Sequence, residues 1–316
     1  MNKAIPPILI IYFNRPQVLK KTLLALAPVQ PSSLFFSSDA PRKNVLSDVA
    51  LVAECHKVVE SVVTWDCAVH HLHAEENQGC DVWVPRSIDW FFTHVEAGII
   101  LEDDCMITEA FCKFSAELLE RYRDEPRIMS ISAANFQEKS WGNGDYYYSR
   151  YPAIWGWATW SRAWQHFDSQ LACVDAFINS PAGLNQLLTD SFERKYWIRF
   201  YRGLKSGKYP FWDAKWVLSV WANDGISITP NQNLVSNIGF GPDATHTKTK
   251  PAGMEMIISE IASPLRSPEN TRQFYEEADS HLFKVRYKPK FKDRIISLKN
   301  RLLGLMSLFL KRVPRL

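Results

Sequence analysis

Short apolar segments alternate with longer amphipathic segments along the first 132 residues. The apolar segments occupy 8–13, 33–36, 69–72, 98–101 and 127–132, and the first of them is far too short to cross a bilayer. Between them, segments such as 16–26 and 45–63 repeat apolar residues at helical spacing. Strands that alternate with helices form right-handed βαβ units. The sequence therefore predicts an α/β fold with a mostly parallel, twisted sheet covered by helices on both faces.

Polar and ionisable residues follow these predicted strands. Arg15 comes after the first strand, Asp39 after the second, and the run "ILEDD" at 100–104 ends the fourth with Glu102, Asp103 and Asp104. The carboxyl ends of parallel strands meet at one edge of a sheet, and ligands bind outside that edge. We therefore expect these side chains to line a site for a polar, phosphorylated ligand.

The acidic triplet at 102–104 suits a hard divalent cation. Carboxylate oxygens are preferred ligands of Mg²⁺ and Mn²⁺, and one or two carboxylates suffice when phosphates and water complete the octahedron. The alternative is a solvated acidic stretch at a helix N-terminus, where the helix dipole favours carboxylates. We favour the cation, because the apolar strand before the triplet directs it to the ligand edge.

The stretch "ILEDDCMITEAFCKFSAELLERY" at 100–122 resembles the strand, acidic triplet and helix of nucleotide-sugar glycosyltransferases of the GT-A fold. The N-acetylglucosaminyltransferase type I family is the most similar. The resemblance implies a Rossmann-like GT-A sheet, a UDP-sugar donor, Mn²⁺ or Mg²⁺, and inverting transfer to a glycan or glycolipid hydroxyl, with N-acetylglucosamine as the suggested sugar. We expect Asp104 to bind the metal directly, Asp103 to contact either the ribose or a group that supports the metal ligands, and Glu102 to contact the sugar.

Two further motifs extend the resemblance to the nucleotide. Arg15 matches the Arg of an Asp-Arg pair that touches the diphosphate in that family, with Asn14 in place of the Asp. "SSDA" at 37–40 matches a Ser-x-Asp turn, which implies that Asp39 accepts a hydrogen bond from the uracil. "PRSIDW" at 85–90 falls where the family has an Arg-His-Tyr segment, which implies that Arg86 lines the uracil, with Ser87 in place of the His.

The loop "GFGPDATHT" at 239–247 resembles the loop that orders over the donor in this family. The resemblance implies that Thr245 contacts the donor and that His246 completes the metal shell, since many GT-A enzymes use a late His in this way. The alternative for His246 is a loop His that hydrogen-bonds phosphate or water.

The run "FWDAKW" at 211–216 resembles the Phe-Trp-Asp-Asp-Trp run of the family, whose second Asp is the catalytic base. Ala214 stands at that second place, so Asp213 is the candidate base. Trp212 and Trp216 flank it, and desolvation by such neighbours would raise its pKa toward a useful range. The alternative is an Asp that caps the helix beginning there.

Aromatic residues become dense after residue 145, as in "WGWATW" at 155–160. Trp155 or Trp157 could stack on a sugar ring, or both could fill the core. Gly156 between them would let a ligand approach the backbone, and the family has a Gly-Leu-Gly-Trp run at the matching place. We expect this region to form the acceptor half.

The charge is unevenly distributed. Residues 284–316 carry 11 of the 37 Lys and Arg and one of the 34 Asp and Glu, which leaves 26 basic against 33 acidic residues in the rest. A negative body argues against nucleic-acid binding. The basic, amphipathic tail is typical of a helix on an anionic membrane surface, although it could also dock on its own domain or on a partner subunit. Because the six cysteines show no metal or redox spacing, we expect a cytoplasmic protein, peripheral on the inner face of the membrane.

The predicted organisation is one GT-A domain followed by two smaller parts. Its bounds are 1–263 for the domain (nucleotide-sugar half 1–132, acceptor half 133–263), 264–283 for a linker and 284–316 for the tail. Two other functions stay open. A sugar nucleotidyltransferase of related fold would use the same carboxylates and metal but attack phosphorus, and a degenerate carbohydrate-binding protein would keep only the aromatic surface.

Overall fold

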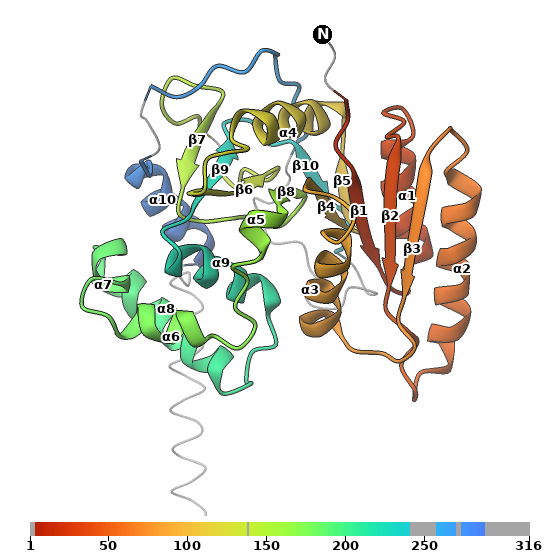
Figure 1. Cartoon of the computed structure of the whole chain (residues 1–316), viewed down its shortest axis with the longest axis horizontal. Coiled ribbons are helices and arrows are strands. Elements are labelled where there is room, and N and C mark those ends of the chain that lie inside the picture. The colour runs from red at the N-terminus through yellow and green to blue at the C-terminus, as the bar shows by residue number, and fades with distance from the viewer. Residues whose placement is uncertain (1–3, 138, 241–256, 270–272, 288–316) are drawn as a thin grey trace, which may run out of the picture. The chain divides into compact units, whose positions relative to one another are not determined.

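The computed structural model describes residues 4–137, 139–240, 257–269 and 273–287 (Figure 1). The chain divides into a large unit, 1–279, and a small one, 280–316. The expected linker at 264–283 therefore falls mostly within the large unit. Most of the basic tail lies outside the described residues.

The first half of the large unit follows the predicted alternation, and all five predicted strands are present. Its elements are β1 (Ile8–Tyr12), α1 (Pro16–Leu26), β2 (Ser33–Ser38), α2 (Leu46–Val62), β3 (Ala68–His73), α3 (Cys80–Phe91), β4 (Ala97–Glu102), β5 (Cys105–Ile107), α4 (Glu109–Arg121) and β6 (Ile128–Ser132). The short β5, directly after the acidic triplet, is an addition that the hydrophobic pattern did not indicate.

The second half mixes short strands with helices. Its elements are β7 (Tyr146–Ser149), β8 (Trp157–Trp160), α5 (Ser161–Trp164), α6 (Ala172–Asn179), α7 (Leu184–Leu187), α8 (Ser191–Lys205), α9 (Trp212–Ala222), β9 (Ile226–Pro230), β10 (Val235–Asn237) and α10 (Glu276–Leu282). A π-helical turn, Phe283–Tyr287, ends the described chain.

Eight strands form the central sheet in the order β3-β2-β1-β4-β8-β6-β9-β7. The pairs β2/β3, β1/β2, β1/β4 and β6/β9 are parallel, while β8 runs antiparallel to both β4 and β6, and β7 antiparallel to β9. Six of the eight strands thus share one direction, which confirms the predicted mostly parallel α/β sheet. Because β8 is reversed, it begins at the edge where its neighbours end.

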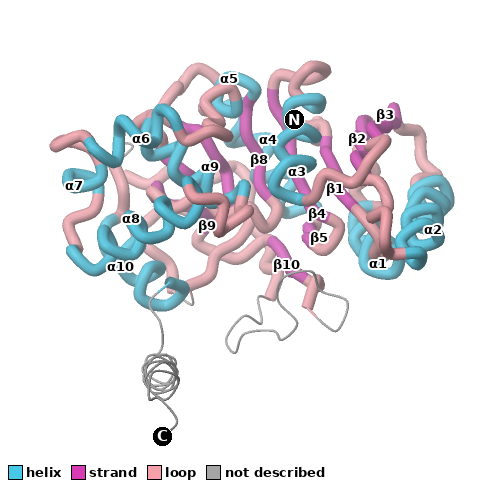
Figure 2. Tube along the Cα trace, turned by 90° about the horizontal axis from the view of Figure 1, so that it is seen from below, coloured by secondary structure: helices cyan, strands magenta, loops and turns pink. Residues whose placement is uncertain are grey.

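Helices cover both faces of the sheet, as predicted. Successive residues of a strand point to opposite faces. Phe36 of β2 belongs to the core that also contains side chains of α1 and α2, whereas the ring centroid of Phe35 lies 4.9 Å from that of Phe91 on α3. Accordingly α3 lies on the face opposite to α1 and α2, and Figure 2 shows α1 and α2 side by side and α3 apart from them.

Most of the aromatic residues of the second half fill a core. Trp157 on β8 is 1% exposed and Trp216 on α9 is fully buried, and their ring centroids lie 5.8 Å apart. Trp164 lies 5.2 Å from Trp216, and Trp212 lies 6.3 Å from Trp157. This cluster joins β8 to α5 and α9, so it fixes α9 against the sheet.

Leu265 and Asp279 are held against the rest of the large unit by buried polar contacts. The Leu265 amide donates to Glu117 Oε1 over 2.9 Å. Asp279 is 1% exposed and accepts from the Arg150 Nε over 3.1 Å and from the Ser149 hydroxyl over 2.5 Å. Charge-assisted bonds of this kind offset the cost of burying a carboxylate. The large unit therefore extends to Asp279.

Within the described part of the chain, none of the helices has the length and hydropathy needed to cross a bilayer.

The two tryptophans around Gly156 give a test of this packing. Trp157→Ala should lower the free energy of unfolding by about 3–5 kcal/mol, because it leaves a cavity in the aromatic cluster. Trp155→Ala, at a half-buried position, should cost less than about half as much. Urea denaturation of both variants measures the difference. Equal losses would show that Trp157 does not hold the cluster together.

Candidate functional site

The acidic triplet lies at the carboxyl edge of the sheet, as predicted. Ile11 near the end of β1 pairs with Glu102 at the end of β4, and the Asp103 amide donates to the Ile11 carbonyl over 2.9 Å. Arg15 occupies the position before the first turn of α1, which starts with Pro16. A proline suits that turn, because its missing N–H needs no partner there. The chain therefore brings Arg15 and the triplet to one place.

Arg15 bridges two of the three carboxylates. Its Nε donates to Asp103 Oδ2 over 3.2 Å, its Nη2 contacts Asp103 Oδ1, and the same Nη2 lies 3.0 Å from Asp104 Oδ2. The side chain of Asp103 is 4% exposed, and Thr22 Oγ1 donates to its carbonyl over 2.6 Å. Burial raises the pKa of Asp103 to about 6, and the charge of Arg15 opposes that rise.

Asp104 is also held by β10, which the sequence analysis did not identify. Asn237 at the end of β10 pairs with Cys105, and its Nδ2 donates to Asp104 Oδ1 over 3.1 Å. A Cβ on Gly239 would lie 2.0 Å from Asp104 Oδ2, so only glycine fits there without a shift. The predicted donor loop therefore starts in contact with Asp104. Thr245 and His246 of that loop lie outside the described residues.

Glu102 and Asp213 come near each other at this edge. Burial raises the pKa of Glu102 to about 8, and the charges of Asp104, Asp103 and Asp213 add to the rise. Asp213 lies in the first turn of α9, whose cap position is Phe211 and carries no side-chain cap bond. Asp213 is therefore not the cap of α9, and its charge acts on Glu102 at the end of β4.

Asp39 and Arg86 meet at the loop that precedes α3. The Asp39 carboxylate is 6% exposed and accepts from the Asn77 side chain over 3.0 Å and from the amides of Gln78 and Gly79 over 3.0 and 2.8 Å. Arg86 Nη1 donates to Gln78 Oε1 over 3.3 Å. Gly79 has φ 75°, a left-handed conformation that favours glycine. Asp39 thus fixes the shape of this loop, a role that the sequence analysis did not foresee.

The segment Trp155–Trp157 enters the same edge, because β8 is reversed. Gly156 has φ 63°, and a Cβ there would lie 3.2 Å from a methyl of Ile107. The half-buried Trp155 has ring centroids 5.1 Å from Phe136 and 5.9 Å from Phe240, the last residue before the undescribed donor loop. Trp157 points into the core instead. Of the two tryptophans, Trp155 is the one placed at the edge.

The residues at this edge fit a divalent cation only in part. Among the described residues, no set of three or more His, Cys, Asp or Glu is arranged to hold a metal. The donors that are present are carboxylate oxygens, which suit Mn²⁺ or Mg²⁺. Asp104 already contacts Arg15 and Asn237. A cation there would take the rest of its ligands from diphosphate and water.

No protein-family model and no curated protein matches this sequence. Among solved structures, 4-diphosphocytidyl-2C-methyl-D-erythritol synthase from Anaerococcus prevotii is similar over 44% of this chain and 59% of its own, at 9% identity and a TM-score of 0.28. A UDP-glucose pyrophosphorylase complexed with UDP-glucose is similar over 45% and 66%, at 7% identity and a TM-score of 0.27. The chain thus spans less than two thirds of either protein. Likeness at this level assigns no activity.

The raised pKa of Glu102 predicts a pH effect on stability. The folded state holds the Glu102 proton up to a pKa of about 8, and the unfolded chain holds it only up to about 4.5. The stability from this group is therefore full below the unfolded pKa and is lost as pH rises through the folded pKa. The side chain introduced by Glu102→Gln cannot ionise. In EDTA, the melting temperature of this variant relative to that of the wild type should therefore increase as the pH rises from about 5 to 9.

An exposed residue supplies the control for this measurement. Glu54→Gln removes an exposed carboxylate on α2 and should follow the wild-type pH curve. If Glu102→Gln also follows that curve, then Glu102 ionises normally in the folded protein.

Proposed function

We propose that this protein is a glycosyltransferase that moves a sugar from a UDP-sugar to a hydroxyl of a glycan or glycolipid, with inversion at the anomeric carbon. The observation that carries the proposal is the meeting of Arg15, the acidic triplet and Asp213 at the carboxyl edge of the sheet. Such edges are where parallel sheets bind their ligands. The resemblance of the triplet and of the 211–216 run to nucleotide-sugar glycosyltransferases supports the same chemistry.

In this proposal the diphosphate of the donor binds near Arg15 and Asp104. A guanidinium donates in parallel to phosphate oxygens as it does to carboxylates, so Arg15 could exchange a carboxylate contact for a phosphate contact. Mn²⁺ or Mg²⁺, when bound at Asp104, would neutralise charge on the departing diphosphate. The loop at 77–79, which Asp39 and Arg86 contact, would lie against the uracil. Trp155 would close the opposite side of the donor site.

Asp213 and Glu102 divide the acid and base work. Direct displacement needs one base, and Asp213 would take the proton of the acceptor hydroxyl as that oxygen attacks the anomeric carbon. Glu102, with a pKa near 8, keeps its proton at neutral pH and would donate a hydrogen bond to a hydroxyl of the donor sugar. Because Glu102 is neutral in this state, it does not add to the repulsion between the carboxylates and the diphosphate.

A sugar nucleotidyltransferase is the second candidate. The two similar structures bear the names of a diphosphocytidyl-methylerythritol synthase and a pyrophosphorylase, and these names fit nucleotidyl transfer better than glycosyl transfer. In that reaction an oxygen attacks phosphorus and pyrophosphate leaves, whereas glycosyl transfer releases a nucleoside diphosphate. Chromatography of the products from a UDP-sugar, with and without added pyrophosphate, separates the two reactions.

Asp104→Ala tests the donor site. The affinity for UDP in the presence of Mn²⁺ should fall at least about tenfold, while the weak affinity in EDTA should change little, because the substitution removes a ligand of the cation. Isothermal titration measures both values, and Asp66→Ala on an exposed bend is the control. Unchanged manganese-dependent affinity in Asp104→Ala would contradict the metal role.

Asp213→Asn tests the base. Turnover should fall by about 10² to 10⁴, the range for loss of a general base, while UDP affinity stays within about threefold. The amide has nearly the shape of the carboxylate but cannot take the proton. Turnover within about threefold of wild type would mean that another group is the base.

A further inference from the structure

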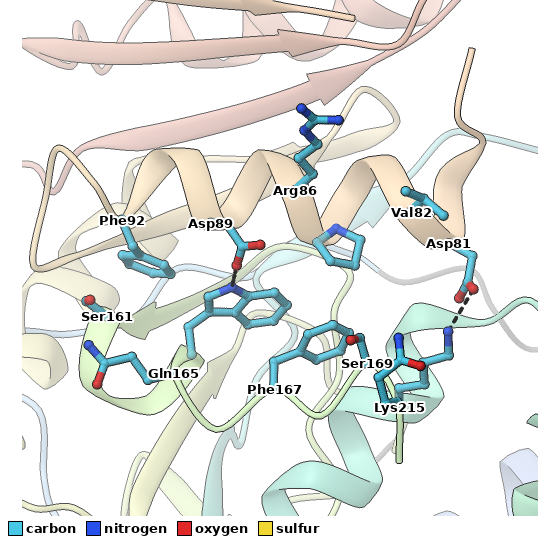
Figure 3. A pocket seen from close by; sticks show the side chains of 13 residues that line it. Asp81, Val82, Arg86, Asp89, Phe92, Ser161, Gln165, Phe167, Ser169 and Lys215 are labelled. Atoms are coloured by element: carbon cyan, nitrogen blue, oxygen red, sulfur yellow. Dashed lines mark hydrogen bonds and ion pairs between the residues drawn. The ribbon is translucent and has the colours of Figure 1, made fainter. Parts of the chain in front are cut away.

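A second cleft lies beside the acidic site, between α3 and the region formed by α5, the loop after it and α9 (Figure 3). Its volume is about 720 Å³, within the range of roughly 300–1,000 Å³ typical of small-ligand sites. All of its lining residues belong to the large unit. Arg86 belongs both to the donor contacts proposed above and to the lining of this cleft, whereas the other lining residues have no role in donor binding.

The apolar part of the cleft is a rigid aromatic surface. The rings of Trp164 and Phe167 are stacked, with centroids 4.5 Å apart and planes 8° apart. The indole Nε1 of Trp164 donates to Asp89 Oδ1 on α3 over 2.7 Å, which fixes the ring. Trp164 itself is only 4% exposed, so the surface that a ligand can reach is formed by Phe167, Phe92 and Val82, with Trp164 packed behind Phe167. Flat apolar surfaces of this kind accept the C–H face of a sugar ring.

Polar groups surround the aromatic surface. Lys215 Nζ lies 2.7 Å from Asp81 Oδ2, at one end of the cleft. Asp81 Oδ1 is buried and, among the described residues, has no hydrogen-bond partner. Because Oδ1 is shielded, a ligand hydroxyl would meet the ion pair of Lys215 with Oδ2 instead. The side chains of Gln165, Ser161 and Ser169 add neutral donors and acceptors.

The charged residues that line the cleft balance in number, with two acidic and two basic side chains: Asp81, Asp89, Arg86 and Lys215. Asp81 pairs with Lys215, and Asp89 accepts from Trp164. Arg86 donates to the neutral Gln78, and Figure 3 shows it pointing away from Phe167, Ser169 and Lys215. The lining therefore offers a charged ligand no net counter-charge, and burying such a ligand would cost solvation free energy. The cleft therefore suits a neutral ligand with several hydroxyl groups.

One end of the cleft adjoins the acidic site. Lys215 lies two residues after Asp213 on α9. The pKa of the Cys80 thiol, one residue before Asp81, is raised by burial and by the charges of Glu102 and Asp81. Asp213 is not among the residues that line the cleft, so a ligand held there would extend from the ion pair of Asp81 with Lys215 toward Phe92.

We propose that this cleft binds a neutral pyranose unit of the acceptor, with the ring against Phe167 and Phe92 and its hydroxyls at the ion pair of Asp81 with Lys215. That this sugar belongs to the acceptor rests on the proposed function, but the binding of a sugar to the cleft can be measured without catalysis. If both hold, the acceptor carries a neutral sugar unit close to the hydroxyl that attacks the donor.

The test fills the cleft from one side. Val82 is 53% exposed on α3, and Val49 is 60% exposed on α2, so Val82→Trp and Val49→Trp are matched substitutions on two helices. Saturation-transfer NMR on the full chain uses methyl β-glucoside, methyl β-galactoside and methyl N-acetyl-β-glucosaminide, with methyl β-glucuronide as the anionic counterpart. At least one neutral glycoside should receive signal in wild type and in Val49→Trp, and Val82→Trp should reduce it at least about tenfold.

A second variant and a second ligand keep the outcomes separate. Ser169→Trp fills the cleft from the opposite wall and should reduce the signal in the same way. UDP with Mn²⁺, titrated into each variant, reports the proposed donor site and should be unaffected. The proposal is overturned if no neutral glycoside binds the wild type, if only the glucuronide binds, if both filling variants bind like wild type, or if filling removes UDP instead. If UDP does not bind the wild type but a neutral glycoside does, the proposed donor site is refuted and the proposal for the cleft is retained.

Discussion

The ion pair of Arg15 with Asp103 and Asp104 is the interaction on which the ligand edge depends. Arg15 starts α1, the two carboxylates follow β4, and Thr22 of α1 binds the Asp103 carbonyl, so one cluster ties β1, α1 and β4 together. Burying such charges costs solvation free energy that apolar residues would not incur. The fold retains the charges at the place where a parallel sheet binds its ligand, which is why we attribute a functional role to them.

The reversed strand β8 explains how an aromatic core and an acidic edge can lie so close together. A parallel strand would end at the ligand edge, whereas β8 begins there and carries Trp157 into the core. The tryptophans of α5 and α9 then pack on it and place the first turn of α9, with Asp213, beside Glu102. The aromatic cluster therefore positions the candidate base, although none of its rings is expected to contact the donor.

The sequence predicted the features that depend on local patterns and missed those that depend on distant pairing. Alternating apolar segments predicted five of the six strands of the first half, all but the short β5, because helical and strand periodicity are properties of neighbouring residues. The insertion of β8 between β4 and β6, and the contact of Asn237 with Asp104, join residues far apart in the chain. Trp155 and Trp157 have the same local pattern, so only their partners distinguish the edge ring from the core ring.

Glu102 and Asp213 illustrate why a close pair of carboxylates can serve two roles. Burial disfavours the charged form of Glu102, and the charges of Asp104, Asp103 and Asp213 add to this effect, so its pKa rises to about 8. Glu102 therefore keeps its proton at neutral pH and can donate a hydrogen bond. Asp213 lies in the first turn of α9, at the positive end of the helix dipole, where a carboxylate is favourable. These positions are the physical reason for assigning the base role to Asp213 and the donor role to Glu102.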